Sequence, residues 1–75
     1  MKHISFTFSI YPSMSRVGLY AVSISSNDGS SSIVLGTTDN VDQVKDALNE
    51  IISEGTDWSH DPQMNVHTME VVHPL

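Results

Sequence analysis

The chain opens with a strict alternation of apolar and polar residues. Apolar side chains stand at every second position, with Ser, Thr and His between them, and the apolar ones are Ile4, Phe6, Phe8 and Ile10. Successive side chains of a β-strand point to opposite faces, so this pattern predicts a strand with one buried face. Pro12 and the polar residues that follow it interrupt the alternation.

The alternation returns in residues 19–26 and again in residues 31–37. Between them, the sequence Asn-Asp-Gly-Ser at 27–30 is typical of a tight turn, because Asn, Asp and Gly tolerate positive φ angles. We therefore predict that the second and third strands form a β-hairpin. In the third strand, Ile33 and Leu35 are expected to face the core.

Residues 39–55 switch to a helical period. Apolar residues recur three and four positions apart, at Val41, Val44, Leu48, Ile51 and Ile52. This spacing predicts an amphipathic helix. Thr38 or Asp39 is predicted to be the N-cap, because a side-chain oxygen there accepts an orphan amide proton, and Gly55 is predicted to be the C-cap.

Residues 56–63 are predicted to form a polar loop. Residues 65–73 are predicted to form a last strand, whose poor alternation leaves its register and its neighbour open. The predicted order is β-β-β-α-β. One amphipathic helix packed on one face of a mostly antiparallel four-stranded sheet makes a two-layer α+β fold. No repeat or linker divides the chain, so residues 1–75 are expected to form a single domain.

Charge is distributed very unevenly along the chain. Seven of the nine acidic residues fall in residues 39–61, where only Lys45 opposes them. The net charge of this segment, 1 − 7 = −6, equals the net charge of the whole chain. A one-sided negative field attracts basic partners and repels nucleic acid and anionic membranes. We therefore expect a basic protein partner, and neither direct nucleic-acid binding nor membrane binding.

Composition also bears on the expected cellular location. The chain has no Cys, which excludes disulfides and thiolate metal sites and fits a reducing cytoplasm. The apolar residues near the start alternate with polar ones, so no signal-peptide core forms, and no apolar run is long enough to span a membrane. The expected location is the cytoplasm.

No pattern in the chain indicates catalysis. A Gly-x-Ser-x-Gly elbow and a Gly-rich phosphate loop are both missing from the sequence. Two groups of side chains could come together, but neither has the spacing of a metal motif. They are His3, His67 and His73 in the predicted strands, and Asp57, His60 and Asp61 in the predicted loop. We expect no enzyme activity, no metal and no cofactor.

The acidic segment supplies the candidate binding site. Acidic residues four positions apart gather on the helix face nearly opposite the apolar stripe, and each step rises about 6 Å along the axis. The candidate partner-binding residues are Asp42, Asp46, Glu50, Glu54, Asp57, Trp58 and Asp61. The alternatives are that the acidic face only keeps the protein soluble, and that Trp58 plugs the core instead of anchoring a partner.

A second surface is the predicted sheet face turned away from the helix. It is rich in small hydroxyl side chains, namely Ser5, Thr7, Ser9, Ser23, Ser25 and Ser32, joined by Ala21 and Val34. Few charges guard the predicted sheet edges, and unguarded edges invite pairing with another chain. The alternative function is therefore a structural or assembly module that self-associates, for example as a homodimer.

Together these patterns favour a small acidic protein-binding module. We expect it to act as an inhibitor that occupies the basic surface of a protein that handles nucleic acid. In its length, acidity and lack of Cys the chain resembles the anti-CRISPR proteins of phages and the immunity proteins of nuclease toxins. The resemblance is one of build alone, because no residue motif in the chain matches a family.

Overall fold

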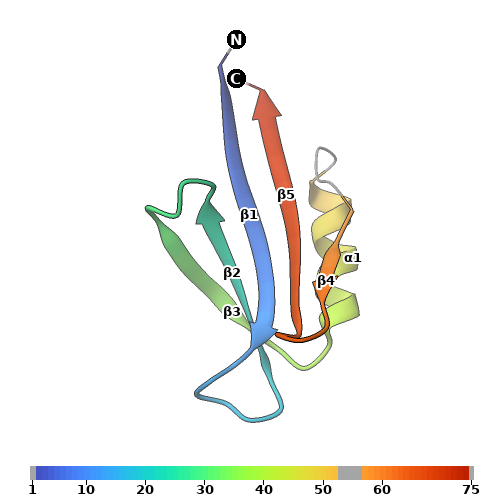
Figure 1. The fold of residues 1–75 in the computed structure, drawn as a ribbon. Helices are drawn as coiled ribbons and strands as arrows, with labels where there is room; N and C mark the ends of the chain where they lie inside the picture. The colour runs from blue at the N-terminus through green and yellow to red at the C-terminus, as the bar shows by residue number, and fades with distance from the viewer. Residues whose placement is uncertain (1, 53–56, 75) are drawn as a thin grey trace.

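The computed structural model describes residues 2–52 and 57–74. Within these residues, five strands and one helix follow one another (Figure 1). Their bounds are β1 His3–Pro12, β2 Tyr20–Ser26, β3 Ser32–Thr38, α1 Val41–Ile51, β4 Ser59–Asp61 and β5 Val66–Pro74. No helix in the described ranges is long and apolar enough to cross a membrane.

The strands form one antiparallel sheet in the order β3-β2-β1-β5-β4. The predicted α+β class and the β2–β3 hairpin are confirmed. The last strand, whose neighbour the sequence left open, lies antiparallel to β1, with Phe8 opposite Met69. Figure 1 shows β3 at one side of the sheet and β5 towards the other.

The prediction of four strands is wrong, because β4 lies within the segment predicted as a polar loop. Its residues Ser-His-Asp show no apolar alternation, so the pattern gave no sign of a strand. The strand forms because a turn at residues 62–65 folds the chain back, and β4 then pairs with residues 66–68. Asn65 adopts a left-handed φ of 54° in this turn, a conformation that Asn tolerates better than most residues.

The core lies between the central strands and the helix. Its buried apolar residues are Phe8, Ile10, Val22, Met69 and Val71, whereas Ala21 is buried on the opposite face of the sheet, in the same row as Ser23. Leu48 and Ile52 pack against the cluster formed by Phe8, Met69 and Val71, although no residue of α1 is itself buried. The helix therefore covers β1 and β5 with a thin apolar contact. On the opposite face of the sheet, Thr7 lies opposite Ser25 and Ser9 lies opposite Ser23, so these predicted hydroxyl residues share one face.

Two predictions about apolar residues are wrong. Ile33 and Leu35 are 64% and 56% exposed instead of facing the core. The reason is that β3 is an edge strand over which α1 does not pack, and a β-bulge leaves Leu35 outside the regular register of the strand. Ile51, predicted to lie in the apolar stripe of the helix, is 78% exposed at the last helical position.

The helix cap also differs from the prediction. Asn40 is the N-cap, and its side-chain oxygen accepts a hydrogen bond from the Gln43 amide at 3.1 Å. Thr38 instead supports the cap from outside, because its hydroxyl oxygen accepts from the Asn40 amide at 3.0 Å. The predicted C-cap, Gly55, lies outside the described residues.

Candidate protein-binding surface

Three of the predicted acidic residues form a row on the outer face of α1. Asp42, Asp46 and Glu50 are all exposed and follow one another at intervals of four residues. The row exists because Leu48 and its apolar neighbours turn the opposite side of the helix towards the sheet. Each interval advances about 6 Å along the helix and turns about 40° around it. We call these three residues the acidic row.

Lys45, the basic residue within the acidic segment, contacts Trp58. Its side chain is half-buried, and its ammonium group lies 5.9 Å from the centre of the Trp58 ring. A cation over the face of an indole is attracted by the ring quadrupole. Because Trp58 packs against the core cluster, this contact draws the only basic residue of the acidic segment towards the sheet.

Trp58 is half-buried and connects the segment before β4 to the helix through its contacts. Its ring packs against the core cluster that contains Phe8, Met69 and Val71, and its Nε1 donates a hydrogen bond to Oδ1 of Asn49 at 3.2 Å. The ring face and the N–H group are thus already engaged within the molecule. This geometry is that of a residue closing the core, the alternative that the sequence left open for Trp58.

The remaining predicted residues are spread over other elements. Asp57 is exposed in the segment before β4. Asp61 is exposed at the end of β4, where one carboxylate oxygen accepts from the amides of Gln63 at 3.0 Å and Met64 at 3.4 Å. Asp61 therefore holds the β4–β5 turn. Glu54 lies outside the described residues.

The structure brings together two histidines that the sequence did not pair. His60 and His67 face each other across β4 and β5, with ring centres 4.2 Å apart and ring planes 10° apart. The sequence feature that could have predicted this pairing is the symmetric placement of His60 and His67 about the turn at residues 62–65. His3 and His73, by contrast, are one register step apart on neighbouring strands and so point to opposite faces.

The environment of His67 favours its neutral form. Burial lowers its pKa below the ordinary value of 6.5, and the nearby Lys45 and His60 lower it further, against a smaller opposing effect of Asp42. Its Nδ1 is buried without a hydrogen-bond partner among the described residues. Within residues 2–52 and 57–74, no group of three or more His, Asp or Glu side chains could hold a metal ion.

Comparison with protein-family models, with curated proteins and with solved structures finds no match to this chain. Any functional conclusion therefore depends on the geometry and the charge of the molecule itself.

Proposed function

We propose that this protein is a small acidic protein-binding module that docks the outer face of α1 on a basic surface of another protein. The observation that carries the proposal is the acidic row of Asp42, Asp46 and Glu50, exposed side by side while Lys45 is drawn to Trp58. The finer form of the proposal is an inhibitor that occupies the basic surface of a protein that handles nucleic acid.

The stability of the helix does not account for this arrangement. Like charges four residues apart destabilise a helix by about 0.2–0.5 kcal/mol per pair, and the acidic row contains two such pairs. Glu50 also stands in the last turn, where negative charge opposes the helix dipole and no basic residue is present. A helix shaped only for stability would alternate acidic and basic residues on this face, so the charge supports a role in binding.

The spacing of the row supports the choice of partner. Successive carboxylates advance about 6 Å along the helix, which is comparable with the separation of neighbouring phosphates along one nucleic-acid strand. Lys and Arg side chains arranged to bind phosphates would therefore find anionic partners at similar intervals. Such binding gains association rate from long-range attraction and weakens as salt screens it.

Two triple variants with the same net charge test the proposal. The first neutralises the acidic row by Asp42→Asn, Asp46→Asn and Glu50→Gln. The control adds three charges at exposed positions away from the helix, by Ser15→Lys, Val17→Lys and Gln63→Lys. Both variants change the net charge by +3, but only the first removes the row.

The assay is capture of proteins from a cell lysate at low salt, followed by mass spectrometry and affinity measurement on the captured partner. Wild type and the lysine control are expected to retain the same basic proteins, and the neutralised variant is expected to lose them. Equal affinity of wild type and the neutralised variant would refute the proposal.

A further inference from the structure

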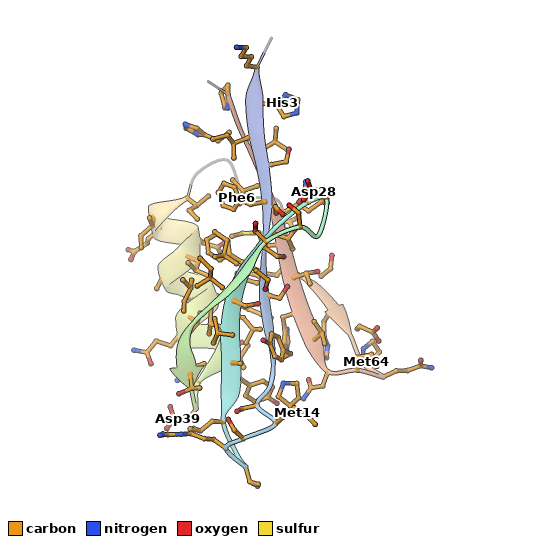
Figure 2. The ribbon with its side chains drawn as sticks, turned by 90° about the vertical axis from the view of Figure 1, so that its left-hand side faces the viewer. His3, Phe6, Met14, Asp28, Asp39 and Met64 are labelled. Atoms are coloured by element: carbon orange, nitrogen blue, oxygen red, sulfur yellow. The ribbon has the colours of Figure 1, made fainter. Side chains whose placement is uncertain are left out.

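The strand β4 is held in the sheet from one side. It has three residues, all exposed, and in the strand order it neighbours only β5. β5 is also paired with β1, along residues 67–74. Figure 2 shows Met64, in the turn that joins β4 to β5, at the outer boundary of the molecule. β4 and this turn can therefore separate from β5 while the other four strands stay paired.

A stacked pair of imidazoles joins β4 to β5. His67 lies two residues before Met69 and so shares the sheet face that α1 covers, and His60 lies opposite it with ring centres 4.2 Å apart. Nε2 of His60 donates a hydrogen bond to Oδ1 of Asn65 at 3.1 Å, and Nδ2 of Asn65 donates to the Tyr20 hydroxyl at 2.8 Å. These contacts hold the hairpin closed while both imidazoles are neutral.

The surroundings of the pair oppose its charged form. In an imidazolium ion both ring nitrogens carry a proton. Nδ1 of His67 is buried and has no hydrogen-bond partner among the described residues, so its proton would be left without an acceptor. Two imidazolium ions stacked with ring planes only 10° apart would also repel each other across a short distance.

The charged and titratable side chains around His67 have the same net effect. They are Lys45 and Asp42 of α1, His60 of β4 and, through Asn65, Tyr20 of β2. β1 contributes only the apolar Ile10 opposite His67. Burial is the largest cause that lowers the pKa of His67, Lys45 and His60 lower it further, and the opposing effect of Asp42 is smaller.

We propose that the His60–His67 stack is a pH-sensitive latch on the β4–β5 hairpin. Protonation of the two rings in mildly acidic solution brings like charges face to face, and β4 separates from β5 while the rest of the domain stays folded. The latch does not depend on the proposed function, because both histidines lie outside the acidic row.

Trp58 limits the extent of the opening. Its ring packs against the core cluster and its Nε1 donates to Asn49, so the residue directly before β4 stays on the core. The opening is therefore confined to residues 59–65. It uncovers the edge of β5 at residues 66–68, where β4 is paired in the closed form. Backbone N–H and C=O groups of that edge then become free to pair with another strand.

NMR spectroscopy of the intact chain between about pH 8 and pH 5 tests the latch. In wild type, nuclear Overhauser contacts between β4 and β5 are expected to be lost as the pH falls, whereas those between β1 and β2 persist. If opening takes up one net proton, its equilibrium constant rises about tenfold for each pH unit. The ring signals of His60 and His67 are expected to titrate over the same range in which the contacts are lost.

Two variants separate the latch from a general effect of acid. His60→Phe keeps an aromatic ring on His67 but removes one of the two charges, so the hairpin is expected to stay closed to a lower pH than in wild type. The matched control is His3→Phe, which removes an exposed histidine outside the stack. This control is expected to open as wild type does.

Three results would overturn the proposal. The first is retention of the β4–β5 contacts at the acidic end of the range in wild type. The second is loss of these contacts at the same pH in wild type and in His60→Phe. The third is simultaneous loss of the β1–β2 contacts, because that result would mean unfolding of the whole domain instead of release of one hairpin.

Discussion

Truncation of Met69 is expected to remove a large part of the stability of this protein. Met69 is 1% exposed and forms the central cluster with Phe8 and Val71. Shortening a buried Met to Ala costs about 2–5 kcal/mol, because apolar contact is lost and a cavity remains. At roughly 0.05–0.15 kcal/mol per residue, a chain of 75 residues has a total stability of about 4–11 kcal/mol.

We expect the stability of this protein to lie towards the lower part of that range. No described residue of α1 is buried, so the helix adds less to the core than a fully packed helix would. A loss of 2 kcal/mol should lower the melting temperature by at least about 8 °C in a domain of this size. Leu48→Ala is expected to cost less than Met69→Ala, because Leu48 is only half-buried.

Urea unfolding followed by tryptophan fluorescence is the suitable assay. Trp58 is the only Trp in the chain and packs against the Met69 cluster, so its emission reports directly on this core. Met64→Ala is the matched control, since Met64 is 67% exposed and its truncation should change the free energy of unfolding by less than about 0.5 kcal/mol. Equal midpoints for the two Met variants would refute the description of the core.

Two further predictions concern pH and the helix cap. Burial lowers the pKa of His67 in the folded state, so the unfolded chain binds a proton at this residue more tightly. The contribution of His67 to the free energy of unfolding should therefore be fully present above the ordinary pKa of 6.5 and should be lost as the pH falls below it. Urea midpoints measured across this range should show that decline in wild type and a smaller one in His67→Phe, and identical profiles would contradict the assignment. Asn40→Ala should cost about 1 kcal/mol of stability because Gln43 loses its capping acceptor. Asp39→Ala should cost much less, and thermal melts in which Asp39→Ala is the more damaging variant would show that the cap is misassigned.

Local pattern determined most of the secondary structure. Strict alternation of apolar and polar residues predicted β1 and β2. The Asn-Asp-Gly-Ser sequence predicted the turn of the β2–β3 hairpin, and the helical period predicted α1. These elements are readable because each is longer than six residues and repeats its own period within the chain. Exposure of the acidic row was equally readable, since a helix that turns apolar residues inwards must turn the opposite residues outwards.

Part of the candidate site could not be read in the same way. The sequence gave Trp58 and Lys45 no relation to each other, because the contact depends on how the chain returns from the helix to the sheet. The path of the chain from the helix back to the sheet also determines that Asp61 accepts hydrogen bonds in the β4–β5 turn and that His60 stacks on His67. Each of these contacts joins residues whose spacing follows no helix or strand period.

What the sequence alone determined is therefore the set of periodic elements and the confinement of charge to one segment. Only the tertiary structure decided that β5 lies between β1 and β4, that the helix covers β1 and β5, and that β3 is left as an edge. The physical reason is that periodicity specifies which side chains share a face, whereas exposure depends on which element covers that face. Ile33 and Leu35 carry a core-like pattern and yet stay exposed, because α1 packs over β1 and β5 and a β-bulge takes Leu35 out of the strand register.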